Sequence, residues 1–273
     1  MTDSPIPTAS YGILQQSQNE HDFNPAVEQI KSKGFAILDS GYSTSELESL
    51  VDAFEQTRKD YLKTYGETRL RDINEHQTIR SPLTLGNPAF LNLAMNENLH
   101  STLRLLIAGK FLLNQQNGLI NPARDVSTQG AWHRDLPYQH FVSSRPLAIN
   151  ALFCIDDFTF ENGATFVLPE SHKSEDFPSP QYIQQNAVQI EAKAGSFIVL
   201  DCMVFHSGGY NKTDAERRGV NHLFTIPYFK QQIKIPDNLK TTNLSDSEKE
   251  ILGFGFQEPG SIEDYFSTRS GKP

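Results

Sequence analysis

The sequence predicts a mainly β protein with flanking helices, whose core is a jelly roll of two packed sheets. Between residues 110 and 230, short apolar segments of strand length are separated by turns, without helical segments between them. Many short strands joined in this way are typical of double-sheet jelly rolls. Apolar residues at helical spacing occur before this region, and a helix start signal follows it. We therefore expect helices at both ends of a β core.

The elements before residue 66 are predicted from spacing and caps. Residues 1–24 are polar without a clear period and predict a tail or a strap over the surface. A short helix over 25–33 leads into a strand over 34–38. A capping box at Ser43–Glu46 begins a second helix. Its apolar residues recur at helical spacing and predict packing on a sheet: Leu47, Leu50, Phe54, Tyr61 and Tyr65.

Residues 66–90 are predicted to be an irregular, polar segment. Long segments of this kind often cover active sites, so we expect a lid here. Arg69, Arg71 and Arg80 suggest an anionic or polyhydroxylated substrate, and a solvated loop is the alternative. A helix is predicted near 98–108.

The remaining elements complete one domain over residues 25–273. The clearest strands are 111–117, 147–155, 164–167, 196–200 and 221–227. A capping box at Ser245 begins a short C-terminal helix, and about the last ten residues are expected to be loose. A chain of 273 residues suits one large domain preceded by the tail.

Composition excludes several classes of protein. The net charge of −9 argues against a nucleic-acid surface. No apolar run reaches about 18 residues, so no transmembrane helix is expected. The N-terminus lacks the basic and apolar segments of a signal peptide. Cys154 and Cys202 lie in apolar runs and are expected to be free buried thiols, which fits a cytoplasmic protein. The oligomeric state is not indicated.

The spacing of His133, Asp135 and His206 predicts a metal site. Residues two apart on a strand project from one face, so His133 and Asp135 can reach the same point. His206, 73 residues later, would complete two imidazoles and one carboxylate. That set is the facial triad of non-haem Fe(II) oxygenases. Arg217, eleven residues beyond His206, is placed to bind a carboxylate through two hydrogen bonds.

Several alternatives compete with this interpretation. His172 is a rival for the second histidine, and His140 and His222 are weaker rivals. The motif at 133–136 also opens the protein-kinase catalytic loop, but that loop needs Asn where this chain has His140. Arg134 is expected to point away from its neighbours and to be structural.

The order of the motifs resembles the phytanoyl-CoA dioxygenase family of Fe(II)/2-oxoglutarate oxygenases. The resemblance covers roughly residues 27–230. It depends on the Trp-His-Arg-Asp motif at 132–135, the apolar strand ending in Asp156-Asp157, the Glu-Asn-Gly motif at 161–163 and the run 195–206 that ends in His206. It implies a double-stranded β-helix of the cupin type, with Fe(II), 2-oxoglutarate and O2.

The resemblance also implies roles for single residues. His133, Asp135 and His206 would be the catalytic metal ligands, while Arg217 would bind 2-oxoglutarate. Adjacent residues on a strand face opposite ways, so Arg218 would then point outwards. Asn114 matches a position that contacts the co-substrate.

One position departs from the family pattern. Many relatives have Ser two residues past the second histidine to assist the arginine, whereas this chain has Gly208, which leaves Ser207 or Thr213 as substitutes. Because Asp135 is present, halogenation is not expected.

The predicted reaction is hydroxylation of a small-molecule metabolite with release of succinate and CO2. Tyr138, Gln139 and His140 follow the metal motif and are the candidate substrate contacts. Desaturation, epimerisation and ring formation share the same centre, and sequence does not separate them. The alternatives are a cupin-like metal enzyme that does not use 2-oxoglutarate and a jelly-roll binding module without catalysis.

Overall fold

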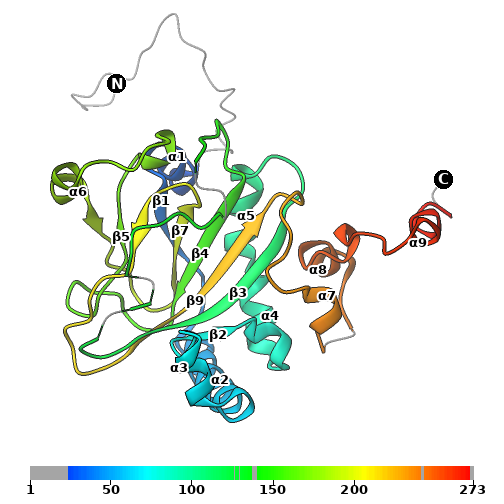
Figure 1. The fold of residues 1–273 in the computed structure, drawn as a ribbon, viewed down its shortest axis with the longest axis horizontal. Helices are drawn as coiled ribbons and strands as arrows, with labels where there is room; N and C mark the ends of the chain where they lie inside the picture. The colour runs from blue at the N-terminus through cyan, green and yellow to red at the C-terminus, as the bar shows by residue number, and fades with distance from the viewer. Residues whose placement is uncertain (1–23, 126, 129, 137–139, 241–242, 271–273) are drawn as a thin grey trace, which may run out of the picture.

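Two antiparallel sheets form the centre of the molecule (Figure 1). The computed structural model describes residues 24–125, 127–128, 130–136, 140–240 and 243–270. The large sheet has the order β1-β7-β4-β9-β3-β2 and consists of β1 (Phe35–Asp39), β2 (Thr78–Arg80), β3 (Leu112–Asn121), β4 (Ala148–Cys154), β7 (Ser196–Asp201) and β9 (Arg217–Thr225). The small sheet has the order β6-β5-β8 and consists of β5 (Phe166–Val167), β6 (Val188–Gln189) and β8 (His206–Ser207). The predicted double-stranded β-helix is confirmed.

Alternation along β4 separates two cores. Ile149, Ala151 and Phe153 pack with residues of the helices, whereas Leu152 and Cys154 pack with residues from the small sheet. Among the helices that contribute to the first core are α1 (Pro25–Lys33), α2 (Thr44–Tyr65), α4 (Pro88–Ala94) and α5 (Glu97–Leu106). The helices therefore cover one face of the large sheet, and the other face looks into the barrel.

Helix starts agree with the cap signals in the sequence. Asn24 accepts a hydrogen bond from the amide of Val27 at the start of α1, which matches the predicted 25–33. Reciprocal capping boxes occur at Ser43, before α2, and at Ser245, before α8 (Asp246–Ile251). Both predicted capping boxes are confirmed, because each requires only residues close in sequence.

The prediction of an irregular segment over 66–90 is wrong. The segment forms α3 (Glu67–Asp72), β2 and a 3₁₀ helix η1 (Pro82–Leu85), and β2 joins the large sheet beside β3. Its elements are too short to show a period, and their buried residues, such as Leu70 and Ile79, stand singly among polar ones. Tertiary burial rather than local pattern orders this segment.

The C-terminal part also contains more structure than predicted. After α7 (Ile235–Asn238) and α8, a 3₁₀ helix η3 (Phe254–Phe256) and α9 (Ile262–Ser267) lie on an arm that projects from the sheets (Figure 1). A helix within the stretch expected to be loose is a correction. Two short helices, η2 (Ser171–Lys173) and α6 (Pro180–Asn186), follow β5. The expected tail lies almost wholly outside the described residues.

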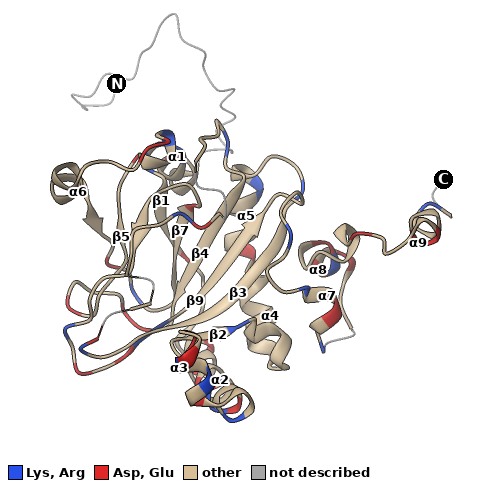
Figure 2. Cartoon of the chain, viewed as in Figure 1, with Lys and Arg blue, Asp and Glu red and all other residues tan. Residues whose placement is uncertain are grey.

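Few charged residues lie on the strands, and both cysteines lie in the core. Figure 2 shows acidic and basic residues interspersed over helices and loops, while the strand bodies carry few. Cys154 and Cys202 are both free and buried, as predicted. Among the described helices, none has the length and apolar character to cross a bilayer.

Candidate metal centre

Backbone pairing brings the three predicted ligands together. His133 lies between β3 and β4 and forms an antiparallel bridge with His206 of β8, with N–O distances of 3.0 and 3.1 Å. The amide of Asp135 donates to the carbonyl of Cys202 at 3.1 Å. These bonds hold residues 133–135 extended, so the side chains of His133 and Asp135 project to the same side.

The ligand atoms of this triad converge on one point. One nitrogen of His133, one of His206 and a carboxylate oxygen of Asp135 lie within 4.8 Å of one another. Asp135 Oδ1 is 3.5 Å from His206 Nε2 and 3.9 Å from His133 Nε2. The triad therefore has the spacing of ligands around a single ion.

The other polar atom of each ligand is fixed by a neighbour. Nδ1 of His133 donates to the carbonyl of Ala131 at 2.7 Å, and Nδ1 of His206 donates to that of Val204 at 3.1 Å. The amide of Asn150 donates to Asp135 Oδ2 at 2.8 Å. Nε2 of both rings and Oδ1 are left for an ion. Two neutral nitrogens and one anionic oxygen, oriented by such outer bonds, fit Fe(II).

Electrostatics favour the metal-binding forms of His133 and Asp135, whereas at His206 burial lowers the pKa but the neighbouring Asp135 outweighs it and raises that pKa. Burial and the neighbouring His206 lower the pKa of His133. Burial by itself raises the pKa of Asp135, but His206, His133 and the bond from Asn150 outweigh it and lower that pKa overall. An ionised carboxylate beside a neutral imidazole is the state that a metal requires.

Arg134 faces the opposite way, as predicted. Its buried guanidinium donates to the carbonyls of Met203 at 2.6 Å and Ser171 at 2.9 Å, and it lies 3.9 Å from the ring centroid of Phe205. Arg134, which lies between the two ligands, thus fixes residues 133–135 against the segments that contain Ser171 and Met203.

The rival histidines lie away from the triad. His172 is buried, with Nε2 3.2 Å from the carbonyl of Lys31. His222 is buried, with Nδ1 3.1 Å from the carbonyl of Ala151. His140 is exposed. None of these three belongs to the convergent group formed by the described residues.

Arg217 lines the same pocket as the triad. Arg217 is buried, and its guanidinium carbon lies 3.8 Å from the centroid of the Phe158 ring. The guanidinium donates to the carbonyls of Asn162 at 3.2 Å and Gly163 at 3.1 Å. Burial lowers its pKa to about 10, so it stays charged at neutral pH. Within the described part of the chain, no carboxylate forms an ion pair with Arg217. A buried charge in this state calls for an anionic ligand.

Glycine is required in the loop that holds Arg217. Gly163 has φ +76°, and an added Cβ would lie 2.3 Å from the carbonyl oxygen of Gly209. The amide of Asn121 reaches the same carbonyl at 3.0 Å. The Asn-Gly step at 162–163 therefore allows two backbone segments to approach each other beside the arginine.

Asn114 does not line the pocket. Its amide donates to the carbonyl of Lys230 at 2.8 Å. The register of β3 shifts between Leu113 and Gln115, so Asn114 is the extra residue of a bulge. The pocket is lined from β3 by Leu119, Ile120 and Asn121 instead. The placement of Asn114 expected from the family pattern is therefore corrected.

None of the other residues predicted to contact the substrate or to assist Arg217 is found among the described residues that line the pocket. Tyr138 and Gln139 lie outside the described residues, and His140 does not line the pocket. Ser207 donates to the carbonyl of Gly130 at 2.9 Å, and Thr213 donates to Asn211 at 2.7 Å. Neither Ser207 nor Thr213 lines the pocket. Neither hydroxyl group therefore takes the place of the serine that many relatives have at the position of Gly208.

The remaining pocket wall contains residues that the sequence did not single out. They share polar side chains on inward faces of strands or in nearby loops: Gln77, Asn121, Ser127, Thr128, Asn150, Thr165 and Asn221. Asn150 had a usable signal, because it is the one polar residue in the otherwise apolar strand β4. From the 66–90 segment, Gln77 lines the pocket, while Arg69, Arg71 and Arg80 do not.

Relatives cover most of the chain. The protein Rv1501 of Mycobacterium tuberculosis, described as uncharacterized, is 30% identical over 257 residues, 91% of this chain and 93% of its own length. The iron/alpha-ketoglutarate-dependent dioxygenase ausO of Aspergillus calidoustus is 27% identical over 173 residues, 56% of this chain and 57% of its own.

Solved structures share the fold. The structure of EctD from S. alaskensis, which contains 2-oxoglutarate and 5-hydroxyectoine, has a TM-score of 0.63 at 18% identity and covers 80% of each chain. The alpha-ketoglutarate-dependent epimerase SnoN has a TM-score of 0.57 at 19% identity, with 81% of this chain and 88% of its own covered. The family model described as phytanoyl-CoA dioxygenase (PhyH) matches residues 30–219. The chain belongs to the phytanoyl-CoA dioxygenase family and is a dioxygenase that uses iron, 2-oxoglutarate and O2.

Proposed function

We propose that this dioxygenase hydroxylates a small-molecule metabolite and releases succinate and CO2. The observation that carries the proposal is one pocket that joins the triad of His133, Asp135 and His206 to the buried Arg217. No carboxylate of the described residues forms an ion pair with Arg217. A dicarboxylate co-substrate has one end to coordinate a metal and another to pair with an arginine. The two halves of the pocket match its two ends.

Each residue has a defined task in this proposal. His133, Asp135 and His206 hold Fe(II), and Asn150 keeps Asp135 Oδ1 turned towards it through the bond to Oδ2. Arg217 pairs with the distal carboxylate of 2-oxoglutarate through a charge-assisted contact. With 2-oxoglutarate and O2, iron held in this way supplies oxidative decarboxylation coupled to oxidation of the substrate.

The substrate is proposed to approach along the part of the pocket wall that is formed by the residue before β2 and by the loop between β3 and β4. The loop residues Ser127 and Thr128 line the pocket together with Gln77, and Gln77 accepts a hydrogen bond from the amide of Thr128 at 2.8 Å. This wall is polar, which suits a ligand with hydroxyl or amide groups. The similar EctD structure, which contains a hydroxylated small molecule, supports hydroxylation as the outcome.

Two wider proposals accompany this function. Buried free thiols at Cys154 and Cys202 support a cytoplasmic location, where thiols remain reduced. A single domain over residues 25–273 is supported by continuous cores that join the helices to the sheets.

The test is turnover of 2-oxoglutarate against a panel of metabolites. Protein, Fe(II), O2 and 2-oxoglutarate are incubated with each candidate, and succinate and the mass of the product are measured. The proposal expects succinate in a one-to-one ratio with a product that has gained an oxygen atom, and expects neither with Asp135→Ala. Succinate with a product that has lost hydrogen or has isomerised would overturn hydroxylation but keep the dioxygenase class. Product formed without consumption of 2-oxoglutarate would support the cupin-like alternative.

A further inference from the structure

Two adjacent arginines begin β9, and only one of them can enter the barrel. Arg217 and Arg218 are the first two residues of the strand and pair with Asn121 and Ile120 of β3. Side chains alternate along a strand, so a shift by one residue would exchange the two. Such a shift needs only a bulge at the strand end. The structure must therefore contain something that decides which arginine faces the pocket.

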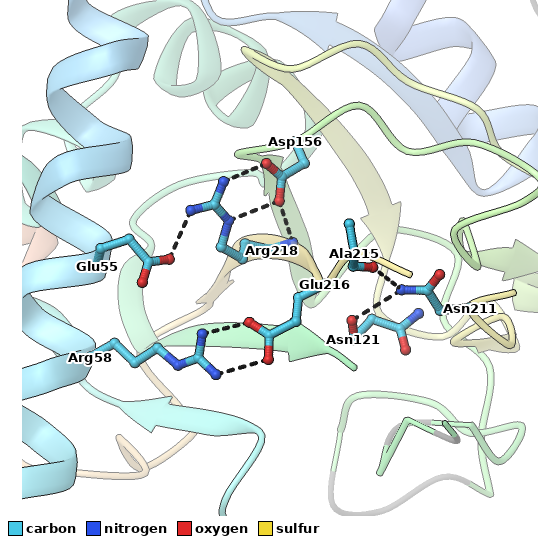
Figure 3. Close-up of polar contacts among 8 residues, drawn as sticks. All are labelled: Glu55, Arg58, Asn121, Asp156, Asn211, Ala215, Glu216 and Arg218. Atoms are coloured by element: carbon cyan, nitrogen blue, oxygen red, sulfur yellow. Dashed lines mark hydrogen bonds and ion pairs between the residues drawn. The ribbon is translucent and has the colours of Figure 1, made fainter. Parts of the chain in front are cut away.

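Arg218 is held outside by two carboxylates (Figure 3). Asp156 accepts Nη2 at 2.7 Å and Nε at 3.0 Å, and it also accepts the backbone amide of Arg218 at 2.7 Å. Glu55 of α2 accepts Nη1 at 2.8 Å. The carboxylates raise the pKa of Arg218 above its usual value, whereas burial lowers that of Arg217. The outward position is therefore the electrostatically favourable one for an arginine here.

The residue before Arg217 is tied to the same helix. Glu216 accepts two hydrogen bonds from Arg58 of α2, at 2.6 and 3.0 Å (Figure 3). The preceding loop is closed by Asn211, which donates to the carbonyl of Ala215 at 2.8 Å and to that of Asn121 at 3.3 Å. Residues on both sides of Arg217 thus point out of the barrel.

We propose that Glu55 and Asp156 are positioning residues that select Arg217 as the arginine of the co-substrate pocket by holding Arg218 outside. The inference rests on the proposed function of Arg217. Bidentate, charge-assisted contacts fix direction as well as distance. Bidentate pairs joined in a network contribute more to stability than isolated surface ion pairs. The network therefore contributes to folding as well as to the direction of Arg218, and the test must separate these two effects.

The decisive experiment uses a double variant and its rescue. Fe(II)-loaded protein is titrated with 2-oxoglutarate without oxygen, and binding is followed by the visible absorption band. Glu55→Gln/Asp156→Asn frees Arg218 to compete for the pocket, and we expect the dissociation constant of 2-oxoglutarate to rise about tenfold, equivalent to about 1.4 kcal/mol. Adding Arg218→Gln removes the competitor, and we expect affinity within about twofold of the wild type, less than ~0.5 kcal/mol.

The control is an ion pair of similar exposure at the edge strand β2. Glu75 pairs with Arg80 at 2.6 Å, and Glu75→Gln should leave affinity unchanged. Hydrogen exchange of the first β9 amides, measured without co-substrate, should accelerate in the double variant. If the double variant does not fold, Glu55→Gln alone is expected to give a smaller increase in the dissociation constant that Arg218→Gln reverses.

Three results would overturn the inference. The first is a double variant that binds 2-oxoglutarate as tightly as the wild type. The second is a triple variant that binds it as weakly as the double variant, because this would indicate that Glu55 and Asp156 have a purely structural role. Failure of the iron-loaded wild type to bind 2-oxoglutarate would overturn the proposed function together with this inference. Wild-type binding with unaffected variants overturns the inference alone.

Discussion

Single side chains determine which atoms face the proposed iron. Asn150 is the clearest case, because its amide occupies Asp135 Oδ2 and leaves Oδ1 beside the two histidines. Partners of this type contribute to affinity by fixing ligand orientation. Asn150→Ala should therefore weaken Fe(II) binding by about 10- to 100-fold, measured by competition with a chelator. Asn186→Ala, in an exposed amide on α6, is the control. Equal affinity in the wild type and Asn150→Ala would refute the role.

The two arginines at the start of β9 face opposite sides of the large sheet. Arg217 lines the pocket, while Arg218 is bound to carboxylates on the outer side. Truncating one partner of a buried charge pair costs about 2–5 kcal/mol. Arg217→Ala should thus raise the apparent constant for 2-oxoglutarate by about 30-fold or more, since each 1.4 kcal/mol is about tenfold. Arg218→Ala should raise it far less in the same steady-state assay. The reverse ranking would mean that Arg218 is the pocket arginine.

At the scale of elements, a buried amide–imidazole contact joins β3, β9 and α4. Gln116 accepts the amide of Leu83 with its oxygen, and its nitrogen donates to the carbonyl of Phe90 and contacts His222 Nε2 at 2.9 Å. His222 Nδ1 donates to the carbonyl of Ala151. The carbonyl of Ala151 accepts a hydrogen bond from either form of the ring, but the Gln116 contact requires His222 Nε2 without a proton. Protonation of His222 would therefore bring two N–H groups together at that contact.

This contact predicts loss of stability in acid. Burial lowers the pKa of His222 to about 4, below the 6.5 of an unperturbed histidine. The unfolded chain then binds more protons between these values, so stability is complete above the higher one and falls as pH decreases towards the lower. His222 should cost about 2 kcal/mol of unfolding free energy between about pH 7 and about pH 5. Denaturant unfolding of the wild type and His222→Gln tests this. Parallel pH profiles would contradict it.

Elements differ in how well the sequence predicts them. The two capping boxes and the strands around 147–155 and 196–200 depend on nearby residues, so pattern reveals them. The bulge at Asn114 and the strand β2 depend on partners distant in sequence. Sequence pattern therefore does not predict the place of Asn114 or the elements within 66–90.

At the scale of the molecule, the metal ligands were predictable and most of the pocket was not. A His-x-Asp pair and a distant His follow from strand geometry, and the structure brings them within 4.8 Å. Residues such as Asn121 and Gln77 enter the pocket only through sheet register and the packing of a loop. The jelly roll places both sets at one site by folding the small sheet over the large one (Figure 1).

Anaerobic binding of 2-oxoglutarate to the iron-loaded protein tests the central claim most directly. The claim is that the triad and Arg217 form one site for metal and co-substrate. Adding 2-oxoglutarate to the Fe(II)-loaded wild type should produce a weak visible absorption band that saturates. His206→Ala should bind no iron and give no band, His172→Ala should behave as the wild type, and Arg217→Ala should need far more 2-oxoglutarate. A wild type that binds iron but gives no band, or a band lost in His172→Ala and kept in His206→Ala, would contradict the account.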